Sequence, residues 1–398
     1  MTATGSTLHA ALSNLLREGV AGATERERTA FDEAVGPLGK SLVLFGAGGL
    51  GRRTLAGLHG YGVEPLAFAD NNRAMWGRQI DSVPVLSPED AAGKYGDSAV
   101  FVITIWGALG KDRMRDRIRQ LKQLGCQRVV SFGPLYWKYP HRLLPHYAAD
   151  LPHKVHAQAD AVYDAFDLWS DEASRMEYIS QVRWRLLLDF DCLANPVAHS
   201  IYFPRDLCAL SPKEVFVDCG AYDGDTLRLF LAEGRASFRR IVAFEPDPAN
   251  FARLEQNVRE SPGVNRDAIS LCHAATGAQP GRVRLIAEGN QSSAIGKVGI
   301  EVDRVTLDDA LWDQPPTYMK MDIEGAELDT LDGARGIIEK HSPVLAICCY
   351  HRQDHLWKIP LLIRALNSDY CFFLRPHDLE TWDLVCYGIP KERLKVAL

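Results

Sequence analysis

The sequence predicts an α/β protein in which a helical segment joins two Rossmann-like domains. The first observation behind this prediction is a complete glycine pattern, GAGGLG at residues 46–51, between an apolar run and an expected helix. The second is a strand, glycine turn and helix pattern at residues 215–231, after which another apolar run ends on Glu245. We therefore expect a Rossmann-type nucleotide-binding-like domain over residues 1–140, a helical linker or cap over 141–212, and a second domain over 213–398.

The composition is that of a globular protein and excludes several function classes. Hydrophobic residues make up 46% of the 398 residues and charged residues 24%, as in ordinary globular domains. The net charge of −6 argues against a general nucleic-acid binder, which needs a basic face. We expect neither a signal peptide nor a membrane span, since no apolar run approaches ~18 residues. Nine cysteines without C-x-x-C spacing favour free thiols, so we expect a cytoplasmic protein.

In the N-terminal domain, the expected elements follow the order of a nucleotide-binding unit. Residues 7–35 are expected to form a helix, and residues 41–45 a strand that runs into the glycine pattern. The next strand ends on Asp70, which follows Gly51 by about 20 residues, the interval of a ribose-binding acid. This pattern predicts a nucleotide cradle whose residues are Gly46, Gly48, Gly51 and Asp70. The alternative is a scaffold that orients or dimerises the protein.

The glycine turn of the second domain differs because acids crowd it. A buried strand ends at Asp218, and Asp223 and Asp225 flank the last glycine of the turn, Gly224. Carboxylates disfavour a pyrophosphate but suit a cation, and S-adenosyl-L-methionine carries a sulfonium and an ammonium but no phosphate. Glu245 ends the next strand, where a carboxylate can accept hydrogen bonds from two ribose hydroxyls. The sequence therefore predicts S-adenosyl-L-methionine as the cofactor.

The remaining cofactor contacts are expected at the carboxyl ends of the strands, where parallel sheets bind ligands. The third expected strand, 269–272, ends just before Ala274, where adenine would lie. The fourth, 318–321, ends at Asp322. The predicted cofactor-binding residues are Asp218, Gly220, Tyr222, Asp223, Gly224, Thr226, Glu245, Ala274 and Asp322.

Two residues at strand ends, Asp322 and His351, are the candidates for catalysis. His351 follows the fifth strand and is the candidate base for an acceptor hydroxyl, because histidine commonly titrates near neutral pH. Alternatively, Asp322 holds a metal such as Mg²⁺, which acidifies the hydroxyl. A plain helix N-cap is the ordinary alternative for Asp322. The Asn-Pro-Pro-Tyr run of amino methylases is absent after the fourth strand, which favours an oxygen acceptor.

Five ordered motifs of the second domain resemble a known family. They are VFVDCGAYDGDT, VAFEPDPANF, VTLDDAL, YMKMDIEGAELDTLDGA and YHRQDHLWKIP. Over about residues 213–388 the chain resembles the FkbM-type S-adenosylmethionine-dependent methyltransferases, and residues 171–203 are similar to the leader of longer members. The resemblance implies a class I methyltransferase fold for the C-terminal domain. It also implies methyl transfer to a hydroxyl of a sugar, glycan or secondary metabolite.

The N-terminal domain carries a resemblance of its own. The runs LVLFGAGGLGRR and AFADNNRAMWGRQIDSVPVL are similar to the N-terminal sugar-nucleotide-binding domain of bacterial sugar acyltransferases. This resemblance implies a nucleotide-sugar ligand, so the expected partners are a small molecule, a nucleotide-sugar or a glycan. The alternative function is an NAD- or nucleotide-sugar-binding oxidoreductase or sensor whose methyltransferase domain is degenerate. Calorimetry with S-adenosylhomocysteine and with NADH separates the two functions, and the sequence leaves open a homo-oligomer.

Several other features have more than one interpretation. The linker histidines are expected to be solvated or capping residues rather than metal ligands; they are His141, His146, His153 and His156. The polar run at 290–293 predicts contacts to sugar hydroxyls or to the cofactor, or else a plain surface turn. Arg375 either faces an anionic substrate or forms a surface ion pair. Residues 352–360 and 370–376 are expected to form the last strands and a lid.

Overall fold

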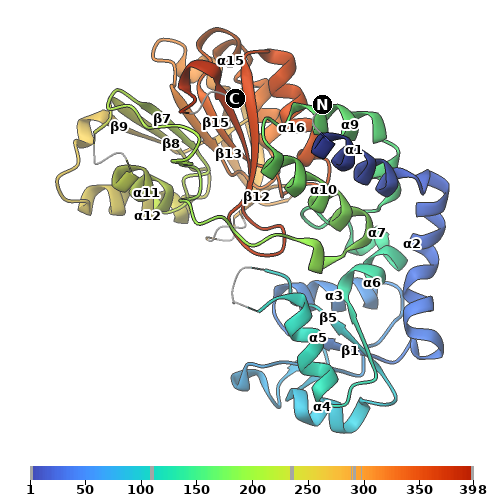
Figure 1. Cartoon of the computed structure of the whole chain (residues 1–398). Helices are drawn as coiled ribbons and strands as arrows, with labels where there is room; N and C mark the ends of the chain where they lie inside the picture. Colours follow the sequence, from blue (N-terminus) through green and yellow to red (C-terminus); the bar gives the residue numbers. More distant parts are fainter. Residues whose placement is uncertain are drawn as a thin grey trace. The chain divides into compact units, whose positions relative to one another are not determined.

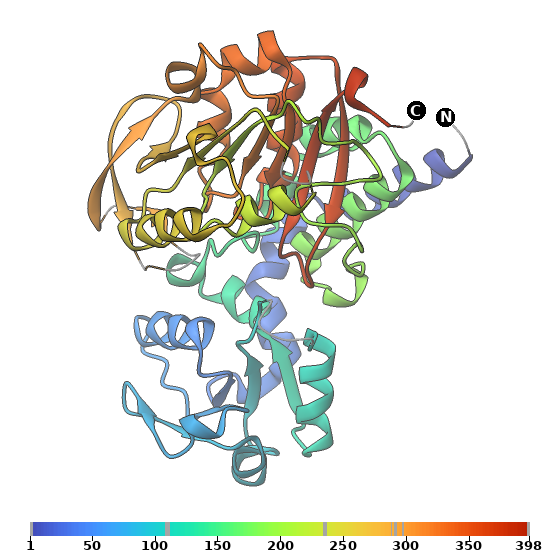
Figure 2. The ribbon, with the colours of Figure 1, turned by 90° about the vertical axis from the view of Figure 1, so that its left-hand side faces the viewer.

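The computed structural model describes residues 3–107, 112–233, 237–287, 289, 293–296 and 298–395. The chain forms two compact units, which are described separately below (Figures 1 and 2). Unit 1 consists of Met1–Ala159, Ile179–Asn195 and Asp378–Trp382, and unit 2 of Asp160–Tyr178, Pro196–His377 and Asp383–Leu398. Each unit contains a mainly parallel sheet with helices, which confirms the predicted α/β class. In the described part of the chain, no helix has the length and apolar character needed to cross a membrane.

Unit 1 begins with two helices where the sequence predicted one over residues 7–35. Helix α1 spans Ala3–Leu16 and α2 spans Gly19–Val35. The prediction was wrong at Gly19, whose φ of 71° lies in the left-handed region that glycine tolerates and that interrupts a helix. Helix α2 buries residues spaced four apart along one face, which is the period of an amphipathic helix; they are Ala23, Glu27, Phe31 and Val35.

The sheet of unit 1 has the strand order β3-β4-β2-β1-β5-β6. Its strands are β1 (Leu42–Phe45), β2 (Ala67–Ala69), β3 (Gln79–Ile80), β4 (Val83–Leu86), β5 (Val100–Ile103) and β6 (Arg128–Ser131). All pairs are parallel except β3 with β4. This short edge hairpin was not predicted, because Pro84 is a weak strand signal that is tolerated near a sheet edge.

The helices of unit 1 cover the sheet and continue into the linker region. They are α3 (Gly49–His59), α4 (Pro88–Tyr95), α5 (Met114–Gln123), α6 (Phe132–Lys138), α7 (Pro140–Leu143) and α8 (His153–His156). The core includes Trp106, whose ring stacks on that of Trp184 with the centroids 5.3 Å apart. Segment Asp378–Trp382 joins this core, since the Trp106 indole N–H donates to the Glu380 carbonyl oxygen at 2.9 Å.

The region predicted as one helical linker, 141–212, contributes to both units. Helix α9 spans Ala159–Leu168 and α10 spans Glu172–Leu187, and α10 belongs to unit 1 from Ile179 onward. The physical reason is that the aromatic residues of the region 141–212 belong to different units. Trp184 is buried in the core of unit 1, whereas Trp169 forms a β-bridge with Phe372 in unit 2.

The main sheet of unit 2 has the order β16-β17-β15-β14-β7-β8-β9. Its strands are β7 (Val215–Cys219), β8 (Arg240–Phe244), β9 (Ile269–Cys272), β14 (Tyr318–Met321), β15 (Val344–Cys348), β16 (Tyr370–Pro376) and β17 (Leu384–Pro390). Strand β17 is antiparallel to both of its neighbours, and the other pairs are parallel. This arrangement confirms the class I methyltransferase fold for the C-terminal domain.

The helices of unit 2 connect these strands. They are α11 (Asp225–Glu233), α12 (Pro248–Glu260), α13 (Leu307–Leu311), α14 (Glu327–Asp332), α15 (Arg335–His341) and α16 (His355–Leu366). The strand expected over 352–360 was wrong, because α16 covers most of it. Pro360 lies inside α16 and is itself buried, so packing outweighs the local tendency of proline to break a helix.

A smaller sheet of unit 2 has the order β10-β13-β11-β12. Its strands are β10 (Ala275–Thr276), β11 (Gly281–Ile286), β12 (Ala294–Ile295) and β13 (Ile300–Val305), and Ala275, Leu285 and Val302 form its core. In the polar run predicted to meet a ligand, Asn290, Gln291 and Ser292 lie outside the described residues. Ser293 donates its hydroxyl to Asp247 at 2.7 Å.

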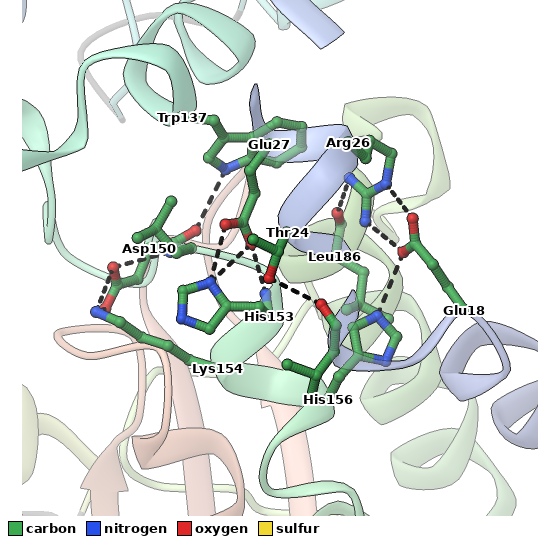
Figure 3. Close-up of polar contacts among 12 residues, drawn as sticks. Glu18, Thr24, Arg26, Glu27, Trp137, Asp150, His153, Lys154, His156 and Leu186 are labelled. Atoms are coloured by element: carbon green, nitrogen blue, oxygen red, sulfur yellow. Dashed lines mark hydrogen bonds and ion pairs between the residues drawn. The ribbon is translucent and has the colours of Figure 1, made fainter. Parts of the chain in front are cut away.

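Ion pairs fasten α8 to α2 within unit 1 (Figure 3). The Glu27 carboxylate lies 2.8 Å from His153 Nδ1 and also accepts the His153 backbone N–H at 2.6 Å. Glu18 lies 3.3 Å from His156 Nε2. The expectation that the linker histidines are solvated or capping residues was wrong for His156, which is 6% exposed.

Glu27 generates a test of stability. Its replacement by alanine should lower the free energy of unfolding by about 1–3 kcal/mol, because the backbone N–H of His153 loses its buried acceptor. Thermal unfolding of the full chain measures the change. The matched control is Glu25→Ala, since Glu25 on the same helix is 60% exposed in its pair with Arg28. Equal loss of stability in both variants would contradict a structural role for Glu27.

Candidate active site

A cavity of about 270 Å³ lies in unit 2 at the carboxyl ends of the main parallel strands. Five strand ends contribute to its lining: Gly220 after β7, Glu245 after β8, Ala274 after β9, Asp322 after β14 and Tyr350 after β15. This edge is where sheets of this kind bind ligands. The residues that the sequence placed at strand ends are therefore gathered around one cavity.

The glycine turn after β7 packs directly on the turn after β14. Gly220 has a φ of 82°, and a Cβ atom there would lie 2.0 Å from the Asp322 carbonyl oxygen. Any side chain at this position would collide with that backbone, so the close approach requires glycine. Tyr222 also has a left-handed φ of 49°, which turns the chain towards Glu245.

Glu245 holds the glycine turn and faces the cavity. Its Oε2 accepts the Tyr222 N–H at 2.8 Å, and its Oε1 accepts the Asp247 N–H at 2.9 Å. Burial raises the pKa of Glu245, although these hydrogen bonds oppose the rise. Oε1 also accepts the Asn250 side-chain amide at 3.4 Å, whereas Oε2 keeps a lone pair that can accept a hydrogen bond from a hydroxyl group.

Asp218 supports the site from within the core. Its carboxylate lies 3.0 Å from Lys320 Nζ, and both side chains are almost completely buried. Burial raises the pKa of Asp218 to about 6. Burial alone would lower the pKa of Lys320, but the Asp218 and Asp322 carboxylates raise it, so the ammonium stays charged. Lys320 also donates to the Gly220 carbonyl oxygen at 2.7 Å, which ties the pair to the glycine turn.

The structure brings most of the predicted cofactor residues together. Those that line the cavity are Gly220, Tyr222, Thr226, Glu245, Ala274 and Asp322. Asp218 does not line it, because it is buried against Lys320. Asp223 does not either, since its carboxylate pairs with Arg228 at 2.8 Å. Gly224 has a structural role, because a Cβ atom there would lie 3.0 Å from Leu254 Cδ1.

The Asp322 carboxylate accepts hydrogen bonds from two tyrosines. The Tyr202 hydroxyl donates to Oδ2 at 2.7 Å, and the Tyr350 hydroxyl donates to Oδ1 at 3.2 Å. Burial alone would raise the pKa of Asp322, but the nearby His351 ring lowers it well below its usual range. Burial and the Asp322 charge raise the pKa of both tyrosines, so they stay protonated donors.

His351 lies between two carboxylates and does not line the cavity. Its Nδ1 is 2.7 Å from Glu327 Oε1, and its Nε2 is 3.2 Å from Asp322 Oδ1. Burial alone would lower the pKa of His351, but the Glu327 and Asp322 carboxylates raise it well above the usual value. An imidazolium has no free lone pair, so this geometry does not fit the predicted role of His351 as a base.

Glu327 is one of the acidic residues that follow β14, and it has a structural role. It is fully buried, and its Oε1 accepts the Ile323 N–H at 3.0 Å while its Oε2 lies 3.2 Å from His355 Nδ1. Glu324 and Gly325, in the turn between β14 and Glu327, have φ values of 53° and 100°. The Glu327 carboxylate therefore stabilises a tight turn that directs Asp322 to the cavity.

The predicted metal on Asp322 does not fit this arrangement. The Asp322 oxygens already face two hydroxyl donors and the His351 ring, which occupy most of the lone pairs that a metal ion would need. Within the described ranges, no group of three or more histidine, cysteine, aspartate or glutamate side chains is arranged to hold a metal ion. We derive no step through Mg²⁺.

Tyr202, Lys320 and Asp383 are among the cavity residues that sequence reasoning did not include in the site. Tyr202 precedes β7 and lies in the stretch 171–203 that is similar to a family leader, which was the available signal. Asp383 comes from the start of the last hairpin strand and carried no local signal. Arg375 is 7% exposed and pairs with Asp171 at 2.6 Å, so it is neither a substrate contact nor a surface ion pair.

The predicted nucleotide cradle forms a similar turn in unit 1. Gly46 has a φ of 115°, and a Cβ atom on Gly51 would lie 1.9 Å from the Gly46 carbonyl oxygen. A Cβ atom on Gly48 would meet no described atom within 4 Å. Asp70 accepts the Ala47 N–H at 2.6 Å and so supports its turn as Glu245 supports the other. Nucleotide binding by this turn stays a prediction.

Comparison with known proteins agrees with this geometry. Residues 218–372 match the family model described as the Methyltransferase FkbM domain. The chain contains an FkbM methyltransferase domain. The matched range includes Glu245, Asp322 and His351. It leaves out the N-terminal unit, so the resemblance of that unit to sugar acyltransferases stays a prediction.

Solved structures extend the likeness beyond the FkbM domain. A methyltransferase FkbM from Methylobacillus flagellatus KT is 24% identical, with a TM-score of 0.77, over 97% of this chain and 99% of that one, which shows a shared fold. A putative rRNA methylase from Clostridium thermocellum is 11% identical over 46% of this chain and 89% of its own, with a TM-score of 0.31. A Rex-family repressor is 20% identical over 24% of this chain and 45% of its own, with a TM-score of 0.20. The last two are too dissimilar to support an argument, and no curated protein matches the chain.

The charged state of His351 generates a pH-dependent test. Because the folded pKa of His351 is raised, its ion pairs stabilise the fold fully below about pH 6.5, and this contribution is lost as the pH rises through the raised pKa. The lowered pKa values of Asp322 and Glu327 set the acid limit near pH 4, below which the contribution is lost. The replacement His351→Gln should therefore lower the melting temperature more at about pH 6 than at about pH 10.

The control for this test is the same replacement made in a Glu327→Gln background. There the pH-dependent difference should shrink, because one of the two carboxylates that raise the pKa is gone. If His351→Gln lowers the melting temperature equally at both pH values, the ring contributes only by packing.

Proposed function

We propose that the FkbM domain is an S-adenosylmethionine-dependent O-methyltransferase that acts on a hydroxyl of a sugar, glycan or secondary metabolite. The family match supports the methyltransferase class and its cofactor. The observation that carries the rest is that one cavity is lined both by Glu245 and by the Tyr202–Asp322–Tyr350 cluster. A donor bound at the first would present its methyl group to an acceptor bound at the second.

The donor side of the cavity suits an adenosine without phosphates. Glu245 Oε2 keeps an open lone pair for a ribose hydroxyl, and Ala274 and Phe244 offer apolar surface for an adenine ring. Lys320 is the basic side chain among the described residues of the lining, and it is already bound to Asp218 and to the Gly220 carbonyl. Among the described residues of the lining, a pyrophosphate would therefore find no free cation, which favours S-adenosylmethionine over a dinucleotide.

The acceptor side can orient a hydroxyl and receive its proton. When bound, S-adenosylmethionine supplies an electrophilic methyl group. The Asp322 carboxylate would accept a hydrogen bond from the acceptor hydroxyl and take its proton as the oxygen–carbon bond forms, while the sulfur–methyl bond of the donor breaks and S-adenosylhomocysteine leaves. Asp322 is a weak base, but a hydroxyl becomes strongly acidic as it gains the methyl group. Tyr202, Tyr350 and His351 fix the carboxylate, so less motion is needed to reach the reactive geometry.

Glu245 tests the cofactor assignment. The replacement Glu245→Ala should weaken S-adenosylhomocysteine binding by about 1–3 kcal/mol, because the ribose hydroxyls lose a charged acceptor. Calorimetry on the full chain measures the affinity. The matched control is Glu255→Ala, since Glu255 is an exposed residue of α12 outside the cavity lining. Equal affinities of parent and Glu245→Ala would show that the ribose is not bound here.

Asp322 tests the acceptor side. Mass spectrometry of host glycans and metabolites, comparing a deletion strain with wild type, identifies the methylated product. In the deletion strain complemented with Asp322→Asn, the rate of product formation should fall by about 10²–10⁴-fold, because the proton acceptor is lost. The control is Asp329→Asn, an exposed residue of α14. Full product from Asp322→Asn, with the cofactor still bound, would remove Asp322 from the mechanism.

A further inference from the structure

The acceptor side of the cavity is strongly acidic. We define the acceptor half as Tyr202, Asp322, Glu324, Tyr350 and Asp383, all of which line the cavity. Three of these five side chains are carboxylic acids and the other two are phenols. The Asp383 and Glu324 carboxylates both lie close enough to Tyr350 to raise its pKa, as Asp322 does. The three carboxylic acids therefore line the same cavity and are not scattered over the surface.

Among the described residues, the basic side chains near the acceptor half are either paired with carboxylates or absent from the cavity lining. Lys320 is bound to Asp218 at 3.0 Å, and both groups are buried. The His351 imidazolium lies between Glu327 and Asp322 and does not line the cavity. Arg352 is exposed and lies beside Gly325, where a Cβ atom would be 2.8 Å from its Nε, and it does not line the cavity either. A bound anion would thus meet carboxylates at the cavity wall.

We infer that the part of the acceptor that enters the cavity is an uncharged polyhydroxyl group, and that the site rejects acceptors carrying a phosphate or carboxylate there. The inference rests on the proposed function and names its substrate class. Sites for phosphates and carboxylates supply arginine or lysine side chains that pair with them. Like charges in a partly desolvated cavity repel strongly, and this repulsion discriminates against the wrong ligand. Carboxylates and phenols instead match the donors and acceptors of hydroxyl groups.

This inference limits where a predicted nucleotide-sugar ligand can bind. If the N-terminal unit binds a nucleotide-linked sugar, the diphosphate does not enter the cavity of the FkbM domain. A sugar hydroxyl distant from the charged groups, or a neutral glycan residue, fits the acceptor half.

The charge of the acceptor half can be measured without knowing the acceptor. Sinefungin resembles S-adenosylmethionine but has an amine on carbon in place of the methylated sulfonium, so its ammonium points to the acceptor. In the full chain, sinefungin should bind at least about tenfold tighter than S-adenosylhomocysteine, which is neutral at this position. In the double variant Glu324→Gln with Asp383→Asn, this preference should fall towards equality. Calorimetry measures both affinities.

The matched control removes two carboxylates elsewhere in unit 2. Asp329 and Asp369 are exposed and do not line the cavity, so Asp329→Asn with Asp369→Asn should keep the preference for sinefungin. An equal affinity of the parent for both ligands, or an unchanged preference in the Glu324 and Asp383 variant, would overturn the inference. Failure of both ligands to bind the parent would instead contradict the proposed function.

The identity of the methylated product is an independent test of the inferred acceptor class. The product found by mass spectrometry should carry its methyl group on a neutral residue. A methyl group next to a phosphate, or on a uronic acid, would overturn the inference even if the cofactor experiments succeed. The control is the same search in cells that carry Asp322→Asn, where this product should be lost.

Discussion

The buried carboxylate of Glu327 is the interaction on which the candidate active site depends. It accepts the Ile323 N–H and lies 2.7 Å from His351 Nδ1, so it joins the turn after β14 to the residue that follows β15. A fully buried carboxylate is costly unless it is paired and hydrogen-bonded, and this one is both. The opposite nitrogen of the His351 ring faces Asp322. The Glu327 carboxylate thereby supports the turn that carries Asp322 and the His351 ring that lowers the pKa of Asp322.

In both units, a carboxylate that accepts a backbone N–H supports the glycine turn. Glu245 accepts the Tyr222 N–H in unit 2, and Asp70 accepts the Ala47 N–H in unit 1. In each case a carboxylate that ends the second strand holds the turn that follows the first strand. In unit 2 this carboxylate also lines a cavity, whereas in unit 1 the ligand of the turn remains a prediction. A shared turn geometry therefore does not by itself establish a shared ligand.

Much of the fold was predictable because its signals are local. Apolar runs, glycine turns and acids at strand ends predicted the main parallel strands, and parallel pairing then brings those strand ends to one edge. The errors have physical causes. Pro84 obscured the edge hairpin β3–β4, because proline is tolerated near a sheet edge. Pro360 obscured α16, because burial in the folded protein outweighed a local preference. Gly19 interrupts a helix whose apolar pattern continues across the break.

By itself, the sequence determined the α/β class, the two glycine turns and the carboxylates Glu245 and Asp322 at strand ends, since these are patterns of neighbouring residues. Only the tertiary structure decided which acids reach the cavity and which charges they meet. Asp218 is buried because Lys320, from another strand, lies against it. The pKa of His351 is raised because the Glu327 and Asp322 carboxylates lie on either side of its ring, an arrangement that does not fit the role of a base. The physical reason is that solvent access and pKa depend on groups that are close in space but distant along the chain.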